Sequence, residues 1–198
     1  MPRVTKSPEV RRAELIDIAL RQFLKQGYEK TSIRGIVAAT GGKVGMFYHY
    51  FKSKEEIFEA ALKRYSDLNF ERISVLLEDR GQRLPQRLIS LFSLVDSMMG
   101  DPGSELIRNL NSQTRVFLMG RMLEQLVPGV AHIIEEATES GIIIRHKLPT
   151  ELLARFLTYG VSAVLYRDDA APSAEGVEQV KQLLTELFQI QPGVLDPI

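Results

Sequence analysis

The sequence predicts an all-α fold, and two observations support this class. Apolar residues recur at helical spacing through most of the 198 residues. Glycine or proline stands at the ends of these apolar segments. The β-branched run at 142–144 could form a strand, but it is too short and isolated to found a sheet. Since no apolar stretch approaches the roughly 20 residues of a membrane helix and no signal-peptide run begins the chain, we expect a cytoplasmic protein.

Helix caps and glycines set the boundaries of the first predicted helices. Ser7 begins the first, because it supplies a capping hydroxyl ahead of a proline and an acid. Gly27 ends that helix, and a serine at Ser53 starts a long one with two glutamates in its first turn. The predicted ranges are 7–26, 32–40, 43–51 and 54–80.

The rest of the chain is also helical in pattern. Its breaks fall at segments that contain glycine or proline, including 100–103, Pro128, Gly141 and Pro149. The helices predicted between these breaks are 83–99, 104–127, 128–140, 150–167 and 173–189.

The net charge of zero hides an asymmetry along the chain. Residues 1–54 hold 11 Lys and Arg against 4 Asp and Glu, a net of +7, whereas residues 55–198 carry a net of −7. A basic end indicates a module that binds a polyanion, although a solvated helix face gives the same pattern. The chain has no cysteine and three scattered histidines, which excludes disulfides and thiolate chemistry; we expect neither a metal site nor a cofactor.

The strongest functional signal is the segment 31–55, where two short helices are joined by a turn at Gly41-Gly42. Two helices joined in this way place a recognition helix in the major groove of DNA. Phe47 and Phe51, four residues apart, would anchor the buried edge of the second short helix. Side chains suited to phosphates and thymine methyls surround its other edges: Lys43, Val44, Met46, Tyr48, His49 and Tyr50. Alone, the run Tyr48–Phe51 is more typical of a core, but here it follows a glycine turn in a basic segment.

The order and spacing of the motifs within residues 9–60 are far more specific than any one of them. They comprise Ile16, Ala19, Phe23, Gly27, Thr31-Ser32-Ile33-Arg34, Ile36, Gly41, Gly45, Tyr48-His49-Tyr50-Phe51 and Ser53-Lys54-Glu55-Glu56-Ile57. Together they resemble the DNA-binding domain of TetR-family transcriptional regulators. Gly35, Gly42 and Lys43 depart from the usual pattern, in which an acid, an aliphatic residue and a Ser or Thr cap are common. These departures predict a looser free domain, not a loss of DNA binding.

The resemblance implies a role for each residue of the site. Arg34 would touch the edge of the DNA from the second helix. The residues that would face the major groove are Lys43, Val44, Gly45, Met46 and Tyr48. Those that would hold phosphates are Thr31, His49, Tyr50 and Lys54. The resemblance also implies a three-helix helix-turn-helix DNA-binding domain at 1–54 and a helical ligand-binding and dimerisation domain at 55–198.

The remainder of the chain offers candidates for an interface and a pocket. The last two predicted helices carry apolar stripes suited to a four-helix interface in a homodimer, although both could pack within their own domain. Met and aromatic side chains could line a site for an apolar effector, but each on its own is more often ordinary core. The ligand-binding candidates are Phe70, Phe92, Met98, Met99, Phe117, Met122 and Tyr159.

The sequence therefore predicts a ligand-responsive, sequence-specific repressor that binds an inverted-repeat operator in double-stranded DNA as a dimer. Its small-molecule effector is unknown. The alternative is a constitutive DNA-binding scaffold that recruits a protein partner and senses no small molecule. We do not expect an enzyme, because the chain lacks a cysteine, a phosphate loop and the Glu-x-x-His pair of di-iron bundles.

Overall fold

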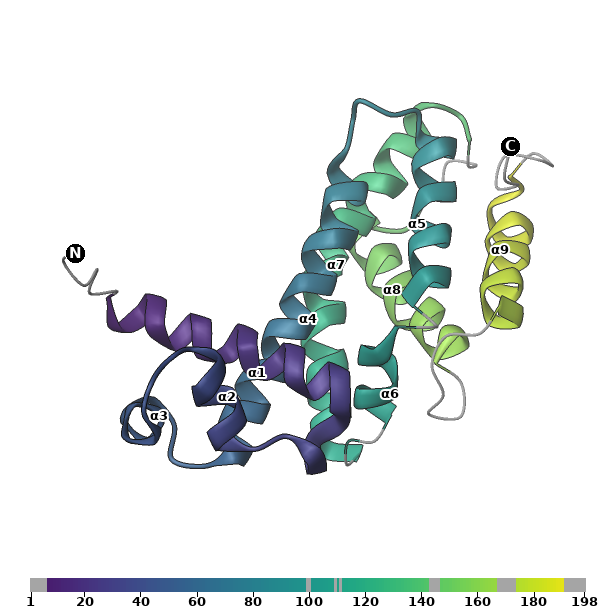
Figure 1. The fold of residues 1–198 in the computed structure, drawn as a ribbon. Coiled ribbons are helices and arrows are strands. Elements are labelled where there is room, and N and C mark those ends of the chain that lie inside the picture. The colour runs from purple at the N-terminus through teal and green to yellow at the C-terminus, as the bar shows by residue number, and fades with distance from the viewer. Residues whose placement is uncertain are drawn as a thin grey trace. The chain divides into compact units, whose positions relative to one another are not determined.

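A computed structural model describes residues 7–98, 101–108, 110, 112–142, 147–166 and 174–190 (Figure 1). The chain forms two compact units, unit 1 up to Leu68 and unit 2 from Asn69 onward. Every regular element within the described ranges is an α-helix, which confirms the predicted fold class. The boundary between the units falls inside α4 (Lys54–Glu78), so one helix contributes to both. The division of functions at residue 54 stays a prediction.

Unit 1 contains α1 (Pro8–Lys30), α2 (Ile33–Ala39), α3 (Val44–Tyr50) and the first part of α4. The hydroxyls of Ser7 and Ser32 cap α1 and α2, as the sequence predicts for the first and allows for the second. Gly27 interrupts the helical path of α1, with φ 79° and ψ 170°. This backbone conformation is open to glycine but strained for other residues, so the regular helix ends where the sequence predicts.

Side chains from all its helices form the core of unit 1. Phe23 of α1 packs edge-on against Phe58 of α4, with ring centroids 4.8 Å apart. Ile36 of α2 and Phe47 of α3 have no exposed surface. Isolated helices as short as α2 and α3 are unstable in water, and burial of each such side chain contributes about 1.5–3 kcal/mol. Packing therefore holds these two helices in place.

Unit 2 contains the end of α4 together with α5 (Leu84–Met98), α6 (Pro102–Arg108), α7 (Ser112–Glu139), α8 (Thr150–Leu165) and α9 (Ala174–Phe188). Helix α7 packs along α8, and α9 contacts both α8 and α5 (Figure 1). Buried apolar clusters join these helices, one around Ala154 and another around Val180.

Two predicted boundaries in unit 2 are wrong. The predicted helix 104–127 is divided between α6 and α7, and α7 runs through Pro128 to Glu139 without a break. A proline inside a helix costs about 3 kcal/mol. Buried side chains flank it on both sides and are Met122, Leu126, Val127, Ile134 and Ala137. Because burial of each large one contributes about 1.5–3 kcal/mol, packing outweighs the cost of the proline. Of the β-branched run 142–144, only Ile142 lies within the described residues.

Within the described ranges, no helix has the length and apolarity needed to cross a membrane. In that same part of the chain, no three His, Cys, Asp or Glu side chains are grouped so that they could hold a metal ion.

Candidate DNA-binding site

The turn between α2 and α3 is built from the end of α2 and two glycines. The N–H of Gly42 donates to the carbonyl of Val37 at 3.3 Å, and the N–H of Gly41 donates to the carbonyl of Ala38 at 3.1 Å. This pair of bonds is the Schellman arrangement, which places its first residue beyond the helix in a left-handed conformation. Gly41 has the required φ of 67°. The turn therefore needs a glycine at 41 and directs the chain sharply into α3.

The buried edge of α3 is formed by Phe47, with Phe51 directly after the helix. Both are at most 1% exposed, and their ring centroids lie 5.7 Å apart. The guanidinium of Arg12 on α1 lies over the Phe51 ring, 4.9 Å from its centroid. These contacts confirm the predicted anchoring edge and fix the rotation of α3 about its axis.

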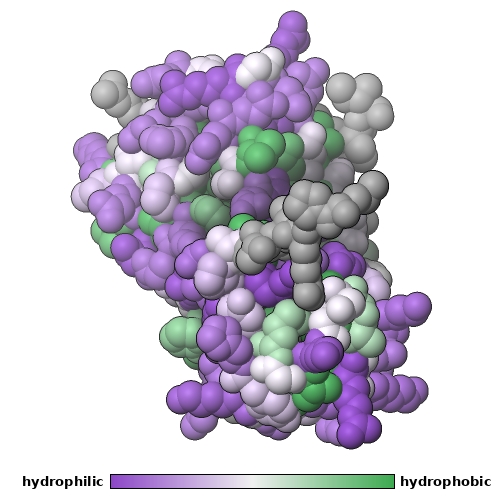
Figure 2. All heavy atoms as spheres, turned by 60° about the vertical axis from the view of Figure 1, so that its left-hand side comes forward, coloured by the Kyte–Doolittle hydropathy of each residue, from purple (hydrophilic) through white to green (hydrophobic). Residues whose placement is uncertain are grey.

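The opposite edge of α3 faces solvent. Tyr48 is 57% exposed and Val44, one turn before it, is 39% exposed. Gly45 and His49 lie beside them and are also exposed, and a Cβ on Gly45 would meet nothing within 4 Å. On the face drawn in Figure 2, apolar patches reach the surface between hydrophilic side chains. The edge of α3 combines the same two kinds of surface, which suits contact with base edges, thymine methyls and phosphates.

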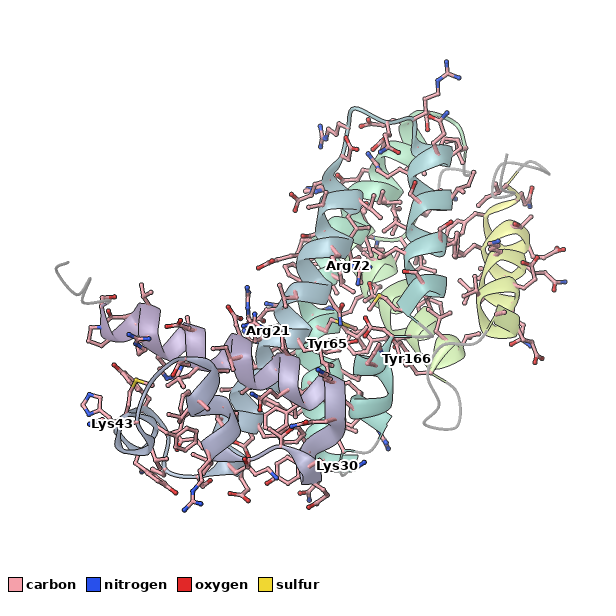
Figure 3. All side chains as sticks on the ribbon, in the orientation of Figure 1. Arg21, Lys30, Lys43, Tyr65, Arg72 and Tyr166 are labelled. Atoms are coloured by element: carbon pink, nitrogen blue, oxygen red, sulfur yellow. The ribbon has the colours of Figure 1, made fainter. Side chains whose placement is uncertain are left out.

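Met46 and Lys43 differ in how freely they extend from α3. The Cε atom of Met46 lies so close to Gly42 that a Cβ there would approach it to 2.5 Å. A side chain at position 42 would therefore require the flexible end of Met46 to shift. Lys43 is the exposed N-cap of α3, and its side chain makes no capping hydrogen bond (Figure 3).

Lys54, the first residue of α4, is held by groups from α1. Its ammonium lies 4.1 Å from the centroid of the Tyr28 ring and donates to the carbonyl of Glu29 at 3.4 Å. The Tyr28 hydroxyl donates to Glu55 at 2.8 Å. Burial, the hydrogen bond to Glu55 and nearby negative charge raise the pKa of Tyr28 to about 12. The pKa of Glu55 is lowered, first by a hydrogen bond from its own backbone N–H and then by those from Ser53 and Tyr28.

The first turn of α4 is capped on both sides of Ser53. The Ser53 hydroxyl accepts from the N–H of Glu56 at 3.2 Å, and the Glu56 carboxylate accepts from the N–H of Lys52 at 2.6 Å. This reciprocal pattern is close to a capping box. It fixes the start of α4 and therefore the position from which Lys54 extends.

Three residues that are predicted to contact DNA do not lie on the exposed edge of α3. Thr31 is 2% exposed, and its hydroxyl donates to the carbonyl of Gly27 at 2.8 Å. Thr31 thus tethers the link between α1 and α2. Arg34 is exposed on α2, and Tyr50 is half-buried, with its ring 4.9 Å from that of His49.

Sequence reasoning missed the residues that position the site from α1. The ring of Tyr28 contacts the ammonium of Lys54, and the guanidinium of Arg12 contacts the ring of Phe51. Gln22 donates to the carbonyl of Gly35 at 3.1 Å. Each of these contacts joins residues far apart in the chain, so helical spacing carries no signal of them. The predicted face was visible because its residues are neighbours in sequence.

Unit 2 contains a cavity of about 260 Å³ between α4, α5, α7, α8 and α9. Its lining is apolar apart from three residues. Thr158 and Ser162 belong to α8, and Tyr166 directly follows that helix. The apolar lining residues are Ile73, Leu77, Leu88, Leu91, Phe92, Val95, Met98, Met122, Leu123, Leu126, Val130, Ile133, Ile134, Ala137, Ile142, Leu157, Val161, Leu165, Val180, Leu184, Phe188 and Ile190.

The cavity contains some of the predicted ligand-binding residues and not others. Phe92, Met98 and Met122 line it. Phe70 packs instead beside the core cluster of Leu77, Met122 and Leu126. Phe117 is 71% exposed on α7, and Tyr159 lies on the surface of α8 with its hydroxyl close to Glu124. Met99 lies outside the described residues.

An exposed apolar face runs over α8 and α9. Helix α8 presents Leu152, Phe156 and Tyr159, of which Phe156 is 65% exposed. Helix α9 presents Leu183 and Leu187. Exposed apolar side chains on adjacent helices are typical of protein interfaces.

The short α3 helix, seated by aromatic residues and exposed on its other edge, defines a helix-turn-helix DNA-binding protein. Residues 15–61 match the family described as "Bacterial regulatory proteins, tetR family". The HTH-type transcriptional repressor DhaR of Mycobacterium sp. strain GP1 is 31% identical over 186 residues, which cover 90% of each chain. The repressor KstR2 of Mycolicibacterium smegmatis is 29% identical over 187 residues, again 90% of each chain.

A solved structure shares the fold over nearly the whole chain. A TetR-family transcriptional regulator from Pectobacterium atrosepticum superposes with a TM-score of 0.68 and 20% identity, covering 92% of this chain and 98% of that one. The chain belongs to the TetR family of transcriptional regulators, with an N-terminal helix-turn-helix domain and a C-terminal helical domain.

Proposed function

We propose that this regulator is a repressor that binds an inverted-repeat operator as a homodimer and releases it when a small molecule enters the cavity of unit 2. The exposed edge of α3 carries this proposal, because Val44, Gly45 and Tyr48 face solvent while Phe47 holds the helix rigidly from behind. A recognition helix needs this combination of a fixed buried edge and a free outer edge.

The proposed contacts divide into two groups. Lys43, Val44, Gly45, Met46 and Tyr48 read base edges, with Met46 contributing least because its side chain folds against Gly42. Phosphate contacts come from Arg34, His49, Tyr50 and Lys54. Thr31 acts through its buried hydroxyl, which donates to the carbonyl of Gly27, rather than as a freely exposed hydroxyl.

The dimer is proposed from the apolar face of α8 and α9. One short helix reads too few base pairs for a specific site, so two recognition helices in successive major grooves are needed. Pairing the exposed side chains of α8 and α9 with those of a second copy would remove them from water, at about 25 cal/mol for each Å² buried. Two relatives that are named as repressors support repression rather than activation.

The cavity favours effector control over the scaffold alternative, which requires no internal space. A ligand can change DNA binding only if it binds the two states of the protein with different affinities. Helix α8 offers a route for this, because it lines the cavity on one side and carries part of the proposed dimer face on the other.

The first experiment is to capture sheared genomic DNA with the purified protein and sequence the fragments retained. Enrichment of an inverted repeat is expected. Retention without a shared motif would contradict sequence-specific binding and favour a scaffold whose specificity comes from a partner.

Substitutions then test the assigned roles on the captured operator. Tyr48→Ala changes both half-sites; a loss of about 1 kcal/mol in each weakens operator binding roughly 30-fold, while binding to random DNA changes little. Lys54→Ala removes two phosphate contacts per dimer and flattens the slope of log K against log salt by about 1.8. Arg21→Ala is the control, because Arg21 is exposed on the side of α1 away from α3 (Figure 3). If Tyr48→Ala binds the operator like Arg21→Ala, the recognition edge is misassigned.

A further inference from the structure

The polar side chains that line the cavity all lie along one edge of α8 and its C-terminal end. Thr158, Ser162 and Tyr166 follow one another at intervals of four residues, so the three lie along one edge at the end of α8. The remaining lining residues are aliphatic, aromatic or methionine side chains. A ligand in this cavity therefore meets polar atoms on one wall and apolar surface on every other described wall.

The two aliphatic hydroxyls on this line have used their donors. Thr158 donates to the carbonyl of Ala154 at 2.8 Å, and Ser162 donates to the carbonyl of Tyr159 at 2.9 Å. A hydroxyl has one donor and two acceptor lone pairs. Thr158 and Ser162 can consequently offer a ligand only acceptor capacity, which favours a ligand that donates a hydrogen bond to one of them.

No charged side chain lines the cavity among the described residues. Four described cations adjoin lining residues in the sequence: Arg72 and Arg121, which are exposed, and Arg87 and Lys181, which are paired with carboxylates. The guanidinium of Arg87 contacts Glu136, and the ammonium of Lys181, which lies over the Phe92 ring, is 3.6 Å from Glu178. Burying an ionised group without a partner is strongly unfavourable, so a carboxylate or phosphate has nothing here to compensate its desolvation.

The volume indicates the size of molecule that the cavity can accommodate. A dry apolar cavity of about 150 Å³ accommodates benzene, and scaling by volume gives about ten non-hydrogen atoms for the 260 Å³ available here. An apolar molecule of this size buries enough surface to bind at micromolar concentrations.

We propose that the effector is an uncharged, mainly apolar molecule of about ten non-hydrogen atoms with one hydroxyl group, which donates one hydrogen bond to the hydroxyl oxygen of Thr158 or of Ser162. This inference rests on the proposed function only in taking the cavity as the effector site. It separates alcohols and phenols from ketones and carboxylic acids of the same skeleton.

The test compares 2-decanol, 2-decanone and decanoate by isothermal titration calorimetry with the full-length protein at pH 7.5. The alcohol and the ketone share the same ten-carbon chain and oxygen position, and only the alcohol can donate a hydrogen bond. We expect 2-decanol to bind about three- to tenfold more tightly than 2-decanone, as one hydrogen bond predicts. Decanoate should bind at least about a hundredfold more weakly, because only about one molecule in a thousand is neutral three pH units above its pKa.

Thr158→Val and Ser162→Ala test the source of the preference. Each keeps the shape of the side chain nearly unchanged and removes the acceptor, so the preference for 2-decanol over 2-decanone should fall to about twofold or less in the double variant. Thr138→Val is the matched control, because Thr138 also donates to a carbonyl four residues earlier, on α7, and lies outside the cavity. Val161→Phe reduces the volume and should weaken all binding, and thermal unfolding checks that it folds.

Each outcome decides the proposal. Equal affinity for alcohol and ketone, tighter binding of decanoate, or a preference that survives in the double variant would each overturn it, as would the absence of binding by all three. Operator binding is measured separately on the same preparations. A protein that binds its operator but none of the three probes would refute the ligand class and leave DNA recognition intact, whereas one that binds 2-decanol but no operator would refute only the proposed repressor.

Discussion

A buried ion pair in unit 2 gives a prediction whose size follows from the geometry. Arg87 of α5 is 1% exposed, and its guanidinium contacts the carboxylate of Glu136 on α7. The same guanidinium donates to the backbone carbonyl of Asp79 at 2.8 Å. Its Nε atom is buried and has no hydrogen-bond partner among the described residues. Replacing the carboxylate with an amide would leave a buried cation whose acceptors carry no charge.

We expect Glu136→Gln to lower the free energy of unfolding by about 2–3 kcal/mol. Breaking a fully buried pair costs about 3–5 kcal/mol because the remaining charge is uncompensated. The Glu136 side chain is 37% exposed, so water screens part of the interaction and the lower value applies. For a chain of this length the loss corresponds to a fall in Tm of roughly 5–10 °C.

The measurement is thermal unfolding followed by circular dichroism at one fixed protein concentration. Glu135→Gln is the matched control, because Glu135 is the exposed neighbour on the same helix and loses the same charge. The double variant Arg87→Met, Glu136→Leu should recover most of the stability, since an apolar pair of similar volume replaces a buried ion pair without penalty. The reasoning is refuted if Glu136→Gln and Glu135→Gln unfold within about 0.5 kcal/mol of each other.

Three further predictions concern the backbone and Tyr28. Gly27→Ala should destabilise by about 1–3 kcal/mol in urea unfolding, because its φ of 79° and ψ of 170° strain any side chain. Within α7, Gly129→Ala should destabilise by about 1–3 kcal/mol because its Cβ would lie 2.7 Å from Leu77, whereas Gly120→Ala, with open space around it, should stabilise by about 0.5–1 kcal/mol. The pKa of Tyr28, about 12, lies above its ordinary 10.0. The contribution of the protonated Tyr28 hydroxyl to the free energy of unfolding is therefore complete below pH 10 and is lost between pH 10 and 12. Unfolding of Tyr28→Phe, measured across this pH range, should lack that loss.

Local signals in the sequence were sufficient for the helix-turn-helix and insufficient for the packing of unit 2. The caps at Ser7 and Ser53 and the glycine at 41 act on neighbouring residues, so their consequences could be predicted from the chain alone. The path of α7 through Pro128 could not, because the buried residues on both sides act through helices distant in sequence.

The pocket residues could likewise be predicted only in part from the sequence. Apolar character identified Phe92, Met98 and Met122, but it cannot distinguish the inner face of a helix from the outer one. Phe117 shares that character and is exposed on the surface of α7. What decides between them is the rotation of each helix against its neighbours, which depends on the whole unit.

The two faces of α8 set a limit on how an effector of the proposed size can act. A full switch between two states requires a difference in ligand binding of about 5.5 kcal/mol. Since a dimer would bind two ligands, each has to supply about 3 kcal/mol, and a ligand of about ten atoms has a total of roughly 3–15 kcal/mol available. About one fifth to all of the binding energy must therefore depend on the state of α8, whose inner edge carries Thr158 and Ser162 and whose outer edge carries Leu152 and Phe156. Reciprocity then requires that saturating operator DNA weaken the binding of 2-decanol by the same factor by which 2-decanol weakens operator binding.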